Sequence, residues 1–427
     1  VSNVEQIIGS GATDVVAQLA TEDISVSAIE TVIGSAGAEV VTFVAATAAT
    51  LAVSRVDTVV GTANAADSVR MLAAQTLALS AIETIQGGTS GTDIVQLLGT
   101  DVAIAESAVE SVVGTSGSTD VLTLLGAGGV TVTDIESVLG SAGADVLTLN
   151  AQNAVIVSGV ETIVATTATG DAVTLLSNAA VALSAVETIV GVAGTNDVVT
   201  LLGAGTIGIS VSSIGTVLGS AGANETVQLI DAGDTVAVSL VNTVLGTTGA
   251  GDIARMLAAG SLAASEIETI AGSTGTDTVT LLSAGSPTVV TAVETVIGTG
   301  GTDGVQLMAA LGAPLAVTDV ATVIGTASSD AARLLGAGTY SLSSIETAIG
   351  AASAFVSPPQ PISEGVSWRI WLKPYSQAMV STLDSSRSRL SPRWKLSSMP
   401  LRPSIGGVRM VPLSCTTGRF FGANITS

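Results

Sequence analysis

Hydrophobic and polar residues alternate in short runs along most of this chain. Val95 and Leu97, for example, flank Gln96. Alternation over four or five residues is the pattern of a β-strand with one buried face. We therefore expect the aliphatic residues of each run to point inward and the polar residues between them to point outward. The residues expected inside include Val95, Leu97, Val199, Leu201, Val279 and Leu281, and those expected outside include Thr200 and Arg255.

These runs belong to a sequence repeat. A Ser or Thr opens each copy, from Ser2 to Ser343, and the 13 intervals over 341 residues average 26.2 residues. Each copy holds three strand-like runs separated by turn-like segments. Gly and β-branched residues dominate, and both disfavour helices, so a helical repeat is excluded. The sequence predicts an all-β fold, a parallel β-solenoid of about 13 coils over residues 1–351, with about 26 residues and three short strands in each coil.

The pattern stops near residue 351. Residues 352–427 form a non-repetitive tail with nine basic and two acidic residues, and they hold eight of the ten prolines. Three interpretations of this tail are open: a disordered secretion or anchoring segment, a small domain that caps the last coil, and an out-of-frame translation. Each of them places a boundary at the end of the repeat.

Charge and composition exclude several classes of function. The formal charge of −22 disfavours nucleic acid as a partner, because phosphate binding needs a basic surface. The chain has no His, and Cys415 is its single Cys, so a disulfide framework and a Cys-based zinc site are excluded. The longest charge-free stretch, from Val198 to Asn224, is rich in Gly, Ser and Thr, so we expect no membrane span.

Two acidic positions recur in the repeat. One is a Glu in the motif Ser-x-Ile/Val-Glu-Thr, as in Glu30, Glu83, Glu136 and Glu187, which three copies replace with Gly215, Asn242 and Ala321. Its tolerance of these replacements predicts a solvated row. The other is a turn acid nine or ten residues later. It is Asp14, Glu39, Asp67, Asp93, Asp120, Asp145, Asp171, Asp197, Glu225, Asp252, Asp277, Asp303 and Asp330.

Stacked coils would place the turn acids about one strand spacing apart, where two carboxylates repel by about 1 kcal/mol in water. Such a row needs either bound cations or another strong interaction. Asp side chains commonly accept N–H bonds of their own turn. If they do so here, replacement of Asp145, Asp171 and Asp197 by Asn should be nearly neutral.

The segment from Gly140 to Leu147, Gly-Ser-Ala-Gly-Ala-Asp-Val-Leu, resembles the haemolysin-type calcium-binding repeat of RTX proteins, whose unit is Gly-Gly-x-Gly-x-Asp-x-Leu-x. The segments starting at Gly88 and Gly272 match equally well. The second Gly of the family's unit is Ser or Thr here. The resemblance implies calcium held between coils by loop carbonyls and the turn Asp residues, namely Asp14, Asp67, Asp93, Asp120, Asp145, Asp171, Asp197, Asp252, Asp277, Asp303 and Asp330.

The leading functional hypothesis is a structural repeat rod of a secreted or cell-surface bacterial protein, such as an adhesin stalk or extracellular spacer. Its partners would be other components of the cell surface or matrix. The resemblance also implies an extracellular location. One alternative is a polysaccharide-acting β-helix enzyme, although no copy of the repeat carries an inserted loop. Another is an ice-binding solenoid that exposes a row of the Thr residues after each Glu.

Overall fold

The computed structural model describes residues 1–350, except 36, 45–48, 64–65, 152–153, 167–169, 195 and 286, together with the backbone of residues 354–357 and 369–372. These residues form strands and turns, and no helix is present among them. The chain divides into two units, Val1–Ala223 and Asn224–Ser427. Among the described residues, no helix has the length and apolar character needed to cross a membrane.

The first unit contains the strands β1 (Gln6–Ile8), β2 (Val15–Ala17), β3 (Ile24–Ser27), β4 (Thr31–Ile33), β5 (Val40–Phe43), β6 (Thr50–Ser54), β7 (Thr58–Val60), β8 (Ser68–Met71), β9 (Thr76–Ser80), β10 (Thr84–Gln86), β11 (Ile94–Leu97), β12 (Ala103–Ser107), β13 (Ser111–Val113), β14 (Val121–Leu124), β15 (Gly129–Thr133), β16 (Ser137–Leu139), β17 (Val146–Leu149), β18 (Ala154–Ser158), β19 (Thr162–Val164), β20 (Ala172–Leu175), β21 (Ala180–Ser184), β22 (Thr188–Val190), β23 (Val198–Leu201), β24 (Thr206–Ser212) and β25 (Thr216–Leu218).

The second unit contains the strands β26 (Asn224–Leu229), β27 (Thr235–Ser239), β28 (Thr243–Leu245), β29 (Ile253–Met256), β30 (Ser261–Ser265), β31 (Thr269–Ala271), β32 (Thr278–Leu281), β33 (Thr288–Thr291), β34 (Thr295–Ile297), β35 (Gly304–Leu307), β36 (Leu315–Thr318), β37 (Thr322–Ile324), β38 (Ala331–Leu334), β39 (Gly338–Ser343), β40 (Thr347–Gly350), β41 (Ala354–Ser357) and β42 (Arg369–Leu372).

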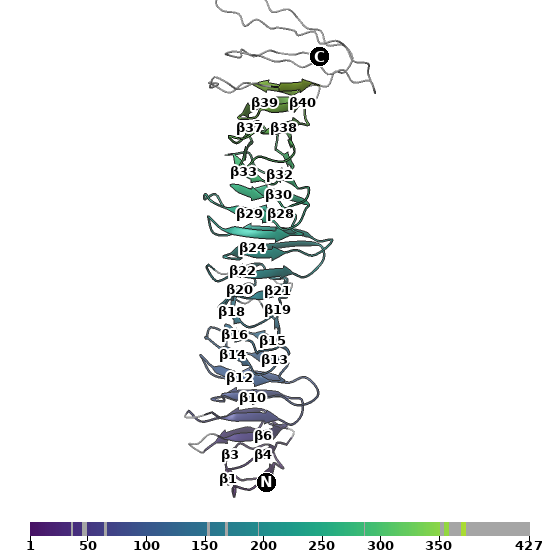
Figure 1. The fold of residues 1–427 in the computed structure, drawn as a ribbon. Helices are drawn as coiled ribbons and strands as arrows, with labels where there is room; N and C mark the ends of the chain where they lie inside the picture. Colours follow the sequence, from purple (N-terminus) through teal and green to yellow (C-terminus); the bar gives the residue numbers. More distant parts are fainter. Residues whose placement is uncertain are drawn as a thin grey trace, which may run out of the picture. The chain divides into compact units, whose positions relative to one another are not determined.

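Within each unit the odd-numbered strands form one parallel sheet and the even-numbered strands form a second (Figure 1). Each strand pairs with the strands two numbers before and after it, so two strands complete one coil. Paired residues lie 16 positions apart at the closest, as in Ser68 and Thr84, and 22 at the farthest, as in Thr188 and Ser210. The predicted all-β parallel β-solenoid is confirmed.

The predicted coil of about 26 residues with three strands is wrong. Because one coil has two strands and one repeat has three, the repeat spans one and a half coils. The first, second and third strands of a repeat therefore alternate between the two sheets from one copy to the next. In the copy that opens at Ser80, the first strand is β10, the second is β11 and the third is β12.

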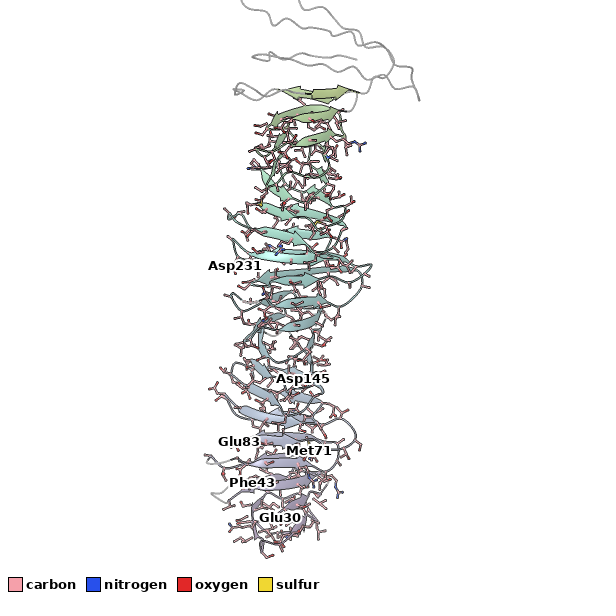
Figure 2. All side chains as sticks on the ribbon, viewed as in Figure 1. Glu30, Phe43, Met71, Glu83, Asp145 and Asp231 are labelled. Atoms are coloured by element: carbon pink, nitrogen blue, oxygen red, sulfur yellow. The ribbon has the colours of Figure 1, made fainter. Side chains whose placement is uncertain are left out.

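Strands of different types stack on one another because their inward residues are alike. Val95 of β11 pairs with Leu77 of β9 on one side and with Val112 of β13 on the other. All three side chains are fully buried. Larger side chains such as Phe43 and Met71 enter the same interior at a few places (Figure 2). Burial of each aliphatic side chain contributes about 1.5–3 kcal/mol, which gives every coil a similar share of the core.

The predicted assignment of inward and outward residues is confirmed. The six aliphatic residues expected inside are buried, and Arg255 is exposed, while Thr200 is half-buried on the outer face. A slip by one residue would have exchanged the two faces of every strand.

The predictions for the tail fall mostly outside the described residues. Within 352–427 the structure describes only the backbone of β41 and β42. These strands pair with β39 and β40, so both sheets of the second unit continue past residue 351.

Candidate functional site

The turn acids are the candidate site, and three kinds of turn surround them. The acid turn joins the first strand of a repeat to the second, as in residues 87–93 between β10 and β11. The small-residue turn joins the second strand to the third, as in residues 98–102. The tight corner joins the third strand to the next first strand, as in residues 108–110. At each edge of the solenoid these three turns follow one another along successive coils.

A complete set of hydrogen bonds joins a turn acid to three consecutive coils, as Asp120 illustrates. Its Oδ2 accepts the Thr115 N–H of its own turn at 2.7 Å and the Ser118 hydroxyl at 2.8 Å. Its Oδ1 accepts the Val102 N–H of the preceding coil at 2.8 Å. Its own N–H donates to Oε2 of Glu136 in the following coil at 2.8 Å. We call this set of bonds the acid-turn cluster.

The acid-turn cluster recurs along both units. The bond from an N–H of the same turn, at 2.5–2.9 Å, is found at Asp14, Glu39, Asp67, Asp93, Asp120, Asp145, Asp197, Asp252, Asp277, Asp303 and Asp330. The bond from the preceding coil, at 2.7–3.2 Å, is found at Asp67, Asp93, Asp120, Asp145, Asp197, Asp252 and Asp277. Asp171 is buried, and its N–H donates to Glu187 at 2.9 Å.

The Glu of the repeat completes this cluster, and its predicted role as a solvated row is wrong. Oε2 of Glu83, for example, accepts the Asp67 N–H at 2.7 Å, and Glu83 is only half-exposed. Asn242 preserves the bond, since its Oδ1 accepts the Glu225 N–H at 3.0 Å. The same bond, at 2.7–2.9 Å, is made by Glu30, Glu110, Glu136, Glu161, Glu187, Glu268, Glu294 and Glu346.

The turn acids do not form the continuous stacked row that the sequence predicted. Asp67 lies between odd strand β7 and even strand β8, whereas Asp93 lies between even strand β10 and odd strand β11. Successive acids therefore lie at opposite edges of the solenoid. The next acid at the edge of Asp67 is Asp120, three coils away, or about 14 Å at the usual strand spacing. At that distance two carboxylates repel by only about 0.3 kcal/mol in water, against about 1 kcal/mol at one strand spacing.

The alternation also separates the Thr residues of the repeat, which the ice-binding alternative placed in a continuous ladder. Thr84 pairs with Ser68 on one side and Ala105 on the other. Thr58 likewise pairs with Val40 and Ala78. The Thr residues of successive repeats are therefore not neighbours in a sheet.

At two turn acids of the second unit, a proline takes the place of the donor in the preceding coil. Oδ1 of Asp303 and Oδ1 of Asp330 are buried and have no hydrogen-bond partner. Elsewhere the donor is the residue just before the third strand, such as Val102 before β12. Here that residue is Pro287 before β33 or Pro314 before β36, and proline has no N–H. The sequence carries a signal for these two exceptions, because Pro287 and Pro314 are the only two prolines of the repeat region.

Restoring the missing donor should stabilise the protein. We expect Pro314→Ala to raise the free energy of unfolding by about 1 kcal/mol. A hydrogen bond to a charged group stabilises the folded protein by about 1.5–3 kcal/mol. Loss of the proline offsets part of this gain, because the more flexible unfolded chain is stabilised by about 0.4–1 kcal/mol. Urea unfolding of the full chain measures the difference.

The matched control adds a proline at the same turn position. In Ala179→Pro the Ala179 N–H, which donates to Asp197 Oδ1 at 2.8 Å, is lost. This variant should be less stable than the parent protein. Equal stability of Pro314→Ala and the parent protein would show that the bond from the preceding coil contributes little.

The turn acids that have a complete cluster do not fit the calcium arrangement implied by the RTX resemblance. In a complete cluster both carboxylate oxygens face backbone N–H donors, which repel a cation. Neighbouring coils at one edge carry no second turn acid. Within the described part of the chain, no three His, Cys, Asp or Glu side chains group where they could hold a metal ion.

Comparisons of the chain with models of protein families, with curated proteins and with solved structures found no match.

Proposed function

We propose that this chain is a structural repeat module, a spacer or stalk of a secreted or cell-surface bacterial protein. The acid-turn cluster is the observation that carries this proposal. Its carboxylates accept backbone N–H groups from two coils, and its N–H reaches a third, as at Asp120. The recurring acids thus hold coils together, which leaves them poorly placed to act on a substrate.

Composition supports placement outside the cell. Residues 1–351 contain 33 acidic residues, four arginines, no lysine and no cysteine. A strongly acidic, cysteine-free and uniform repeat suits an extracellular spacer, since high net charge keeps such a protein soluble. Other components of the cell surface or matrix would be its partners. Protease treatment of intact cells that produce the full protein should degrade it before a cytoplasmic marker.

The enzyme alternative has little support in this arrangement. A polysaccharide-acting β-helix needs carboxylates and basic groups gathered in one groove. The four arginines of the repeat region, Arg55, Arg70, Arg255 and Arg333, are instead scattered along the sequence. Incubation with a panel of acidic and neutral polysaccharides should release no reducing ends, and release of product would favour the enzyme.

A calcium titration tests the role of the acids. A solenoid held by its own backbone donors should melt at the same temperature in millimolar calcium as in sodium chloride of matched ionic strength. A ligand that binds only the folded state would instead raise the melting temperature by mass action. A rise with calcium beyond the salt control, smaller with magnesium and reduced when Asp145, Asp171 and Asp197 are all replaced by Asn, would replace this proposal with a calcium-stabilised rod.

A further inference from the structure

One carboxyl group lies inside the solenoid rather than at its edge. Glu106 occupies an inward position of β12 and is only 5% exposed. The same position of the third strand is filled by aliphatic side chains in other repeats, such as Leu79 in β9, Val132 in β15 and Leu183 in β21. Glu106 therefore replaces a core residue of the repeat with an ionisable one.

The surroundings of Glu106 stabilise its charge poorly. In the even-numbered sheet it pairs with Ile85 of β10 and Leu124 of β14, and both are buried. Strands β9 to β15 contain no other titratable side chain. The polar contact of the carboxyl group is Oε2 accepting the Val109 N–H of the tight corner at 3.1 Å.

The ionisable groups that act on Glu106 are themselves acidic. The pKa of Glu106 is raised from 4.5 to about 7, chiefly by burial, and the Val109 N–H opposes this rise. The negative charges of Glu110, in the adjoining tight corner, and of Asp145, in the acid turn before β17, contribute smaller parts of the same rise. No basic side chain is among the groups that shift it.

We propose that Glu106 makes the coil that contains β12 a pH-controlled weak point of the first unit. The coil stays closed while the carboxyl group carries its proton, and it opens locally when the proton is lost to water. A buried carboxylate among aliphatic side chains favours the open form, in which water solvates the charge. This property is separate from the spacer function and from the acid-turn clusters.

The direction of the pH effect follows from linkage. The folded-state pKa lies above the unfolded value, so the closed coil has its full stability below pH 4.5 and loses it as the pH rises through 7. Between pH 5 and pH 8 the local opening constant should rise on the order of 100-fold. Above that range little further change is expected.

Native-state hydrogen exchange of the full chain tests the proposal. Three amides report on this coil. The Ala105 N–H donates to the Glu83 carbonyl, and the Leu125 N–H donates to the Glu106 carbonyl. The Val109 N–H donates to Oε2 of the Glu106 side chain. Their protection, corrected for the intrinsic pH dependence of exchange, should fall between pH 5 and 8. It should stay constant in Glu106→Leu, which introduces the residue found at position 183, and in Glu106→Gln, which keeps an acceptor for Val109.

The matched control is Glu266→Gln, which removes the same charge from an exposed tight corner of the second unit. It should leave the pH response of the β12 amides unchanged. An equal pH response in the parent protein and Glu106→Gln would overturn the proposal. A response spread evenly over all coils would also overturn it, because one buried carboxyl group acts only on its own neighbourhood.

Discussion

Replacement of Gly140 by alanine should lower the free energy of unfolding by about 3 kcal/mol, the upper part of the range for overpacking. Gly140 opens the acid turn of Asp145. A Cβ at Gly140 would lie 1.8 Å from the carbonyl oxygen of Gly159 in the following coil and 3.0 Å from Asp145 Oδ2. The Gly140 N–H also donates to the Ser158 carbonyl at 2.7 Å, so the backbones cannot separate without losing that bond.

The control is a glycine in a small-residue turn of the same unit. A Cβ at Gly126 would meet nothing within 4 Å, and its φ is not in the left-handed region. Gly126→Ala should therefore change stability little. Urea unfolding of both variants measures the difference, and equal effects would show that the coils separate at little cost.

One copy of the repeat already has alanine at the position of Gly140. Ala165 keeps the same backbone bond, because its N–H donates to the Ser184 carbonyl at 2.8 Å. That turn accommodates a methyl group, so the expected cost at Gly140 reflects a turn whose other residues have not adapted to one. If Gly140→Ala proved neutral, acid turns other than that of Ala165 would also accommodate a methyl group at this position.

Close packing explains both glycines of the motif that resembles the calcium-binding repeat. The first glycine faces the carbonyl of the following coil, as at Gly140. The second faces the preceding coil, since a Cβ at Gly143 would lie 2.4 Å from the Ala127 Cβ, and Gly275 faces Ala259 in the same way at 2.3 Å. The motif glycines are thus required by the distance between coils, whether or not an ion binds.

Much of the fold could be predicted from the sequence because alternation fixes which face of each strand is buried. The number of coils could not. Inward residues of all three strand types are aliphatic, as Leu77, Val95 and Val112 show, so the pattern does not reveal which strand stacks on which. The tight corners decide this. Ala81 has φ 51° there, and such a residue lets the chain reverse within a few positions.

The candidate site was predicted in its residues but not in its arrangement. The recurrence of Asp and Glu identified the acids, yet their placement on alternate edges depends on the coil of two strands. The departures from the repeat were visible in the sequence, namely Glu106 among aliphatic residues and the prolines Pro287 and Pro314. Their consequences required knowing which N–H each carboxylate accepts.

Replacement of Asp277 by asparagine should destabilise the second unit by about 2 kcal/mol, whereas the same replacement at Asp330 should have almost no effect. Asp277 Oδ2 accepts the Ser273 N–H at 2.5 Å, and Oδ1 accepts the Gly260 N–H at 3.0 Å. Asparagine has one acceptor oxygen, so its amide group would face an N–H donor in either orientation. The sequence-based expectation that Asn is nearly neutral therefore changes for complete clusters.

Asp330 is the matched control because its cluster lacks one bond. Its Oδ2 accepts the Thr326 N–H at 2.5 Å, while Oδ1 is buried without a partner beside the turn that ends in Pro314. Asparagine can keep the bond to Thr326 and place its amide group on the free side. In both clusters the acid's N–H donates to a glutamate of the following coil, at 2.8 Å for Asp277 and 2.7 Å for Asp330. Urea unfolding of the two variants isolates the bond from the preceding coil. Equal losses would show instead that the negative charge itself, rather than the second acceptor oxygen, stabilises the turn.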